Sequence, residues 1–181
     1  MVSIAINHIV LREFRESDWM AVHEYACDPE VSRYMEWGPN TEDETRTFIK
    51  RALAWQLEEP RRFYEFAVVN AEDETVIGAA GIRRAEAPFD QADVGYCYHQ
   101  KVWGRGTATE VCKALIRFGF EELDLHRIIG KCDADNIGSA RVLQKAGMRQ
   151  EAHFVKDLYA KGAWRDTLLF AILQDEWRRL R

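Results

Sequence analysis

A turn with two glycines, placed between a predicted strand and a predicted helix, is the feature that most restricts how this chain can fold. It reads Gln100-Lys101-Val102-Trp103-Gly104-Arg105-Gly106-Thr107-Ala108. Two glycines separated by one residue let the backbone curl without Cβ clashes. The first amides of the following helix then point outward, unpaired, at the positive end of the helix dipole. Such a turn either holds a phosphate or pyrophosphate or serves as a tight corner.

The turn lacks the residues of two common nucleotide-binding motifs. It has no Gly-Lys-Ser/Thr ending of a nucleotide-triphosphate loop, and it has no third glycine of a dinucleotide-binding unit. Lys101 and Arg105 make the turn basic. Since the chain as a whole carries a net charge of −5, this positive charge is a local feature of the turn and does not reflect the overall composition. An anion bound here is therefore expected to be neither ATP in a Walker loop nor NAD.

Composition favours a single globular domain over residues 1–181. The chain is 47% hydrophobic and 30% charged, which is ordinary for a globular protein of this length. Its negative charge argues against nonspecific nucleic-acid or membrane-surface binding. No apolar run approaches the roughly 18 residues of a membrane span, and the N-terminus does not read as a signal peptide. We expect a cytoplasmic protein with no nucleic-acid or membrane partner.

The cysteines and histidines show no metal-ligand spacing. Because the four cysteines are scattered, they are expected to be reduced thiols, and no metal site is expected. The residues in question are Cys27, Cys97, Cys112, Cys132, His8, His23, His99, His126 and His153.

Hydrophobic patterns and capping residues predict a strand, two helices, three strands, a helix, a strand, a helix and two strands. This order indicates an α/β (α+β) fold with a mixed sheet and helices on its faces. Ser17 or Asp18 is expected to cap the first helix, Thr41 with Glu44 to form a capping box, and Gly147 to end the last helix. The predicted strands cover 9–15, 63–69, 76–82, 92–98, 127–132, 149–158 and 166–173, with turns at 71–74, 88–90 and 161–162.

Four segments, taken in order, match a known enzyme superfamily. They are Val10-Leu11-Arg12 before the Asp18 helix, Val76-Ile77-Gly78 with Gly81, Val94-Gly95-Tyr96 running into Trp103-Gly104-Arg105-Gly106-Thr107-Ala108-Thr109-Glu110, and Asn136-x-x-Ser139 with Val142-Leu143 and Lys145-Ala146-Gly147-Met148. Together they resemble the GNAT superfamily, the Gcn5-related N-acetyltransferases. They look most like its RimJ/RimL branch of ribosomal-protein N-terminal acetyltransferases, over nearly the whole chain.

The resemblance implies a mixed, mostly antiparallel sheet of about seven strands flanked by about four helices. It also implies an acetyl-CoA-dependent N-acetyltransferase that moves the acetyl group directly to a primary amine through a tetrahedral intermediate. In such enzymes the glycine turn binds the pyrophosphate through backbone amides, and the preceding strand pairs with the pantetheine arm. The cofactor residues implied here are Cys97, Tyr98, His99, Val102, Trp103, Gly104, Arg105, Gly106, Thr107, Ala108, Asn136 and Ser139. From the sequence alone, Asn136 is better explained as a helix N-cap, and the two roles are compatible.

Two residues are catalytic candidates by the same resemblance. Asp93 occupies the strand position where the superfamily often places a carboxylate that acts through water, although it also reads as an exposed aspartate in a hairpin strand. The helix position that often holds a tyrosine acid is Leu143, which cannot donate a proton. Ser139 is the replacement candidate for orienting the CoA sulfur, and its alternative is an ordinary first-turn residue of the helix.

The acceptor side is less specified. In the family, one wall of the acceptor cleft is usually formed by the loop that here carries Tyr34, Met35, Glu36 and Trp37, and Glu36 and Trp37 are the substrate-binding candidates. Trp164 with the Lys161-Gly162 turn usually forms the other wall. The loop also reads as an aromatic segment packed on the core. Cys132 is expected to be a buried, inert thiol, and a mixed disulfide with CoA is the alternative.

Two further functions stay open at the level of sequence: a non-catalytic acyl-CoA-binding sensor or scaffold, and a nucleotide-binding protein. The acceptor of a transferase would be a protein N-terminus or a small amine such as a polyamine, an amino acid or an antibiotic. A homodimer would suit the family, but the sequence identifies no interface.

Overall fold

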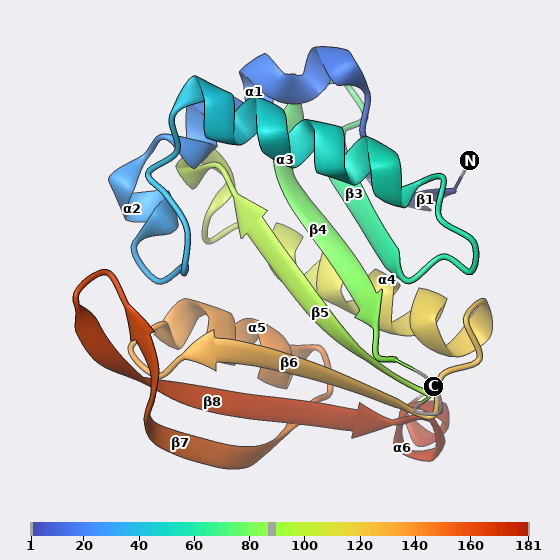
Figure 1. Cartoon of the computed structure of the whole chain (residues 1–181). Coiled ribbons are helices and arrows are strands. Elements are labelled where there is room, and N and C mark those ends of the chain that lie inside the picture. The colour runs from blue at the N-terminus through green and yellow to red at the C-terminus, as the bar shows by residue number, and fades with distance from the viewer. Residues whose placement is uncertain (1, 87–89, 181) are drawn as a thin grey trace.

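An eight-stranded sheet organises the fold in the computed structural model, which describes residues 2–86 and 90–180 (Figure 1). The strands follow the order β1-β2-β3-β4-β5-β6-β8-β7 across the sheet. They are β1 Ser3–Ile6, β2 Ile9–Glu13, β3 Phe63–Asn70, β4 Val76–Arg84, β5 Gln91–Tyr98, β6 Arg127–Asp133, β7 Arg149–Ala160 and β8 Ala163–Leu173. The α-helices of the described residues are α1 Trp19–Ala26, α2 Pro29–Ser32, α3 Glu42–Trp55, α4 Thr107–Glu121, α5 Ile137–Lys145 and α6 Gln174–Arg179, and the 3-10 helices are η1 Glu16–Asp18 and η2 Gln100–Val102.

The predicted mixed, mostly antiparallel sheet with helices on its faces is confirmed. Neighbouring strands pair antiparallel, except for β5 and β6, which pair parallel. Strand β1 and helices α2 and α6 were not predicted, because each is only four to six residues long and shows too few turns of a periodic pattern. The predicted turn at 88–90 falls largely on 87–89, outside the described residues.

Local capping rules hold at most of the predicted helix ends. The Thr41 amide donates to Glu44 Oε2 at 2.8 Å, and the Glu44 amide donates to Thr41 Oγ1 at 3.3 Å, as a capping box requires. Asn136 Oδ1 accepts from the Ser139 amide at 3.0 Å, and Gly147 follows α5 with φ +94°.

Asp18 is the exception among the caps. It directly precedes α1, but its side chain makes no hydrogen bond to an amide of that helix. Its carboxylate instead accepts from the Arg15 amide and from the guanidinium of Arg12 on β2. The Asp18 carboxylate, which the sequence pattern predicted to cap α1, therefore forms an ion pair with Arg12 instead.

The helices cover the two faces of the sheet with separate apolar clusters (Figure 1). Alternation along the strands puts Phe66, Ala80 and Val94 on the face covered by α4. The opposite face carries Ala67 and Ala79 and is covered by α1 and α3. The sheet is thus held from both sides, and its strands keep a defined register.

Strands β5 and β6 pair at one end only and separate at the other (Figure 1). The four paired residues of β5, 91–94, lie beside 127–130 of β6. Beyond Val94 the last four residues of β5 have no partner on β6, and the glycine turn and α5 lie at this open end. The separation exposes a strand edge inside the molecule rather than at its rim.

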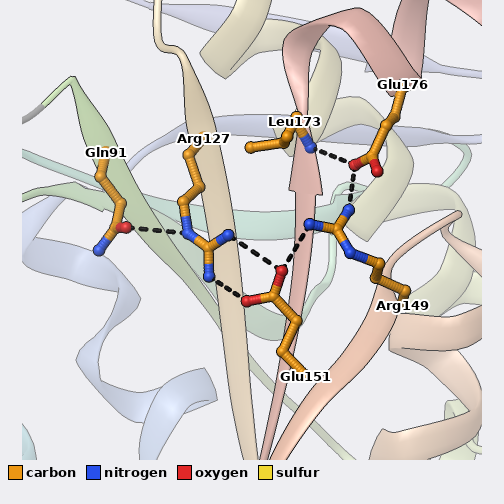
Figure 2. Close-up of polar contacts among 6 residues, drawn as sticks. All are labelled: Gln91, Arg127, Arg149, Glu151, Leu173 and Glu176. Atoms are coloured by element: carbon orange, nitrogen blue, oxygen red, sulfur yellow. Dashed lines mark hydrogen bonds and ion pairs between the residues drawn. The ribbon is translucent and has the colours of Figure 1, made fainter.

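A network of charged side chains closes the paired end, as Figure 2 shows. Arg127 of β6 donates to Gln91 Oε1 of β5 at 3.0 Å and binds the Glu151 carboxylate of β7 through both terminal nitrogens. Arg149 of β7 joins Glu151 to Glu176 of α6. The network ties β5, β6, β7 and α6 together, so the opening between β5 and β6 is confined to the other end.

Candidate active site

The glycine turn has a conformation that only glycine adopts readily. Gly104 and Gly106 have φ values of +74° and +87°, and a Cβ at either position would meet nothing within 4 Å. Conformation, rather than crowding, therefore accounts for both glycines. The turn brings the backbone directly onto the first residues of α4.

The amides of residues 104–108 make no hydrogen bond within the described part of the chain. The amides of Val102 and Trp103 donate to the carbonyls of His99 and Gln100 in η2, at 3.1 and 3.0 Å. Of the amides from Val102 to Ala108 that the sequence indicated, five are thus available to an anion at the N-terminus of α4.

A cavity of about 490 Å³ lies in the opening between β5 and α5, reaching from the glycine turn to α2. Its wall contains most of the predicted cofactor residues. It is lined by Glu30, Val31, Tyr34, Met35, Tyr96, Cys97, Tyr98, Val102, Trp103, Gly104, Gly106, Thr107, Ala108, Thr109, Asn136, Gly138, Ser139, Arg141, Val142 and Lys145.

His99 and Arg105 are the two predicted cofactor residues that do not line this cavity. The Nδ1 atom of His99 accepts from the Lys101 amide at 3.2 Å, so His99 caps η2. The exposed side chain of Arg105 lies between the two glycines and outside the wall. The cavity adds Arg141 and Lys145, two exposed cations one helical turn apart on α5, which the sequence analysis missed although their i, i+4 spacing could have indicated them.

The strand edge facing the gap belongs to Tyr96 and Tyr98. The His99 amide donates to the Ile77 carbonyl of β4 at 3.0 Å. In a strand, alternate residues direct their backbone N–H and C=O groups to the same side. The backbone groups of Cys97 therefore also point to β4, whereas those of Tyr96 and Tyr98 point into the opening. The Tyr98 carbonyl accepts from Trp103 Nε1 at 3.0 Å. An extended ligand arm lying here would therefore meet the backbone of Tyr96 first.

Tyr96 also reaches across the opening with its side chain. Its hydroxyl lies 3.0 Å from Ser139 Oγ and 3.3 Å from the Ser139 carbonyl. Leu143, which occupies the usual tyrosine position, is buried, and its side chain packs against Gly130 of β6. Sequence reasoning missed Tyr96, because this hydrogen bond joins residues 43 positions apart.

Asp93 stands one residue before the point where β5 and β6 separate. It lies opposite Arg83 of β4 and Ile129 of β6. Burial raises the pKa of its carboxyl above the usual value of an aspartate, while the charges of Arg83 and Lys131 act in the lowering direction. Asp93 is not among the described residues that line the cavity.

The comparisons with known proteins agree with this geometry. A family model described as the acetyltransferase (GNAT) domain matches residues 8–149. The chain belongs to the GNAT acetyltransferase family. It is therefore an acetyltransferase enzyme, and GNAT acetyltransferases use acetyl-CoA.

Individual relatives resemble this acetyltransferase over nearly its full length. It is 32% identical over 174 residues to the uncharacterized N-acetyltransferase YnaD of Bacillus subtilis (strain 168), covering 96% of this chain and 98% of that protein. The structure of a GNAT-family acetyltransferase from Bacillus anthracis superposes with a TM-score of 0.86 at 30% identity, covering 96% of this chain and 99% of the other. The structure of a ribosomal-protein-S5-alanine acetyltransferase from Vibrio fischeri superposes with a TM-score of 0.80 at 25% identity, covering 98% of this chain and 99% of the other.

Cys132 of the acetyltransferase is a buried thiol beside Ser139. Burial raises its pKa to about 11, although the Ser139 hydroxyl acts in the opposite direction. The thiol is therefore protonated at neutral pH and a poor nucleophile. Among residues 2–86 and 90–180, no helix has the length and apolar character needed to cross a bilayer.

The residues predicted to form the acceptor wall lie only partly along the cavity. Glu36 and Trp37 are exposed and do not line the cavity. Tyr34 and Met35, just before them, do line it, together with Glu30 and Val31 of α2. Of the four residues named in this loop, Tyr34 and Met35 therefore line the cavity, and the two substrate-binding candidates Glu36 and Trp37 do not.

The tip of the β7–β8 hairpin reaches α2 through one hydrogen bond. Lys161 Nζ donates to the Ser32 carbonyl at 2.6 Å, and the same carbonyl accepts from the Met35 amide at 2.9 Å. Ser32 itself is fully buried. The contact joins the β7–β8 hairpin to the end of α2, so it restrains the segment that carries Tyr34 and Met35.

Replacing Lys161 by alanine is expected to loosen that segment. The loss of a charged hydrogen bond is worth roughly 1.5 kcal/mol, which corresponds to about tenfold faster local opening. Hydrogen exchange of the Met35 amide measures the effect, and Lys156→Ala on the same hairpin is the control. Equal exchange rates in the two variants would show that the Lys161 contact does not restrain α2.

Proposed function

We propose that this N-acetyltransferase uses acetyl-CoA as donor and transfers the acetyl group directly to a primary amine. The observation that carries the proposal is the continuity of the cavity. It begins at five unbonded amides at the N-terminus of α4, follows the unpaired edge of β5, and ends at α2. The unbonded amides suit a pyrophosphate, and the unpaired edge of β5 suits an extended pantetheine arm. The end of the cavity at α2 leaves room for an acceptor.

Several residues fit CoA on physical grounds. Asn136 uses Oδ1 to cap α5, which leaves its Nδ2 without a partner among the described residues and available to a pantetheine carbonyl. Arg141 and Lys145 make no ion pair within the described residues, and their charges suit phosphate groups. We propose that one domain, residues 1–181, carries the whole activity, because strands from both halves of the chain share the sheet that forms the cavity.

The acceptor we propose is a protein N-terminus or a small amine. A carboxylate at the α2 end of the cavity, Glu30, suits an ammonium group, which would compete there with Arg33, an exposed ion-pair partner at 3.6 Å. The similarity to a protein named a ribosomal-protein-S5-alanine acetyltransferase supports a protein N-terminus as one acceptor class.

The test is thiol release from acetyl-CoA with a panel of peptides, polyamines, amino acids and aminoglycosides. Release with one class would establish the donor and the acceptor class together. Calorimetry with CoA separates the two parts of the proposal, because CoA binding requires no acceptor. Absence of both CoA binding and thiol release would overturn it.

Asp93 is proposed to take up the amine proton through water. Asp93→Asn is expected to lower kcat/KM for the acceptor about a hundredfold, within the usual range for loss of a general base, and to leave CoA affinity unchanged. A base works when deprotonated, so activity is lost as pH falls through its pKa. Because burial raises that pKa, the loss should begin above the usual range of an aspartate.

The pH–rate profile provides the control for Asp93. Asp93→Asn should remove the acid limb, whereas Asp43→Asn on the exposed face of α3 should retain it. An unchanged acid limb in Asp93→Asn would remove this residue from the mechanism.

A further inference from the structure

The contact between the Tyr96 and Ser139 hydroxyls joins β5 to α5 across the opening, beside a longer contact from the Tyr96 hydroxyl to the Ser139 carbonyl. The two hydroxyl oxygens are 3.0 Å apart, and both residues line the cavity. Tyr96 comes from the unpaired end of β5, and Ser139 comes from the first turn of α5. The two hydroxyl groups thus join β5 to α5 at the wall of the cavity.

The groups around Ser139 indicate the direction of donation. The Tyr96 phenol has two acceptors within reach, Ser139 Oγ at 3.0 Å and the Ser139 carbonyl at 3.3 Å. The carbonyl lies in the first turn of α5, where the amide four residues later is its regular helical partner. The shorter distance favours donation from the phenol to the Ser139 hydroxyl. Burial raises the pKa of Tyr96, so the phenol keeps its hydrogen across the working pH range.

A serine hydroxyl that accepts one hydrogen bond still has its own hydrogen to donate. The Cys132 thiol lies close to this hydroxyl, but sulfur in a thiol is a weak acceptor. A sulfur anion within the cavity would be a much stronger one, because hydrogen bonds to charged acceptors are about twice as strong as neutral ones.

We propose that Tyr96 is a positioning residue that aims the Ser139 hydroxyl at the sulfur of the departing CoA thiolate. This inference rests on the proposed function, since it requires CoA in the cavity. Tyr96 acts only through Ser139, and Ser139 is the group that touches the leaving atom.

The bonds and protons of this step balance without a further reagent. The amine nitrogen bonds to the acetyl carbon, the carbon–sulfur bond breaks, and its electron pair stays on sulfur. The amine proton leaves through water towards Asp93. Ser139 donates a hydrogen bond to the thiolate and keeps its proton, and solvent protonates the thiolate after release.

The kinetic test compares Tyr96→Phe, Ser139→Ala and the double variant with the wild type. Tyr96→Phe keeps the ring and removes only the hydroxyl. We expect kcat to fall about tenfold in Tyr96→Phe, with KM for acetyl-CoA changed less than twofold, as for loss of one hydrogen bond to a developing charge. The double variant should be no slower than Ser139→Ala, because Tyr96 acts through Ser139.

Tyr64→Phe is the matched control. Tyr64 is a partly buried tyrosine on the same face of the sheet, where it packs against Phe118, outside the cavity wall. Its loss should leave kcat unchanged. A kcat in Tyr96→Phe equal to that of Tyr64→Phe, or losses in the two single variants that multiply in the double variant, would overturn the proposal.

A second measurement needs no acceptor. The thiol of enzyme-bound CoA is titrated by its thiolate absorbance, after subtraction of the CoA-free protein. Donation from Ser139 should lower the pKa of the bound thiol relative to free CoA, and Tyr96→Phe should raise it by about one unit, which is tenfold in proton affinity. An identical titration in wild type and Tyr96→Phe would overturn the role of Tyr96 even if acetyl transfer is confirmed. A wild type that does not bind CoA would overturn the proposed function and this inference together.

Discussion

Replacing Gly106 by valine is expected to lower the affinity of the enzyme for CoA by at least about a hundredfold. Gly106 has φ +87°, where a β-branched residue is strained by about 1–3 kcal/mol. Its new side chain would also occupy the open space beside the cavity wall, next to the unbonded amides of residues 104–108. An anion could then no longer approach the backbone. Calorimetric titration with CoA measures the loss.

Gly162→Val is the control for backbone strain. Gly162 has φ +80°, a Cβ there also meets nothing within 4 Å, and the residue lies in the β7–β8 turn outside the cavity wall. Both variants should lose similar thermal stability, but only Gly106→Val should lose CoA affinity. Unchanged CoA affinity in Gly106→Val would refute the placement of the pyrophosphate at this turn.

Replacing Asp18 by alanine is expected to cost about 3 kcal/mol of unfolding free energy, because it leaves a largely buried guanidinium without its partner. Arg12 Nη1 and Nη2 bind the two Asp18 oxygens at 2.7 and 2.8 Å, and the Arg15 amide donates to the same carboxylate at 2.7 Å. The side chains are only 18% and 6% exposed. For a chain of this length, that loss corresponds to a fall in Tm of roughly 10 °C.

The comparison variant is Glu86→Ala, which removes an exposed pair. Arg62 and Glu86 lie 3.1 Å apart with exposures of 38% and 80%, so the loss should stay within about 0.5 kcal/mol. Urea unfolding of both variants measures the difference. Similar small losses in the two would show that water replaces the carboxylate at Arg12.

Much of the fold and part of the site were predictable, because they depend on residues close together in the chain. The Thr41–Glu44 box and the Asn136 cap each involve residues three positions apart. The fold class also followed from the order of the periodic segments, and the family relationship agrees with it. Short elements such as β1 and α6 were missed, since a few residues carry little periodic signal.

The turn at Gly104 and Gly106, the cap at Asn136 and the strands that flank them could be predicted from the amino-acid sequence, because each depends on local backbone preferences. Which side chains meet depends instead on how the strands and helices pack. Strand register and the separation of β5 from β6 bring Tyr96 to Ser139 across 43 positions, and the hairpin brings Lys161 to Ser32 across 129. The same packing turned the Asp18 carboxylate away from α1 and towards Arg12. Such contacts follow from the mutual placement of whole elements, which no local pattern encodes.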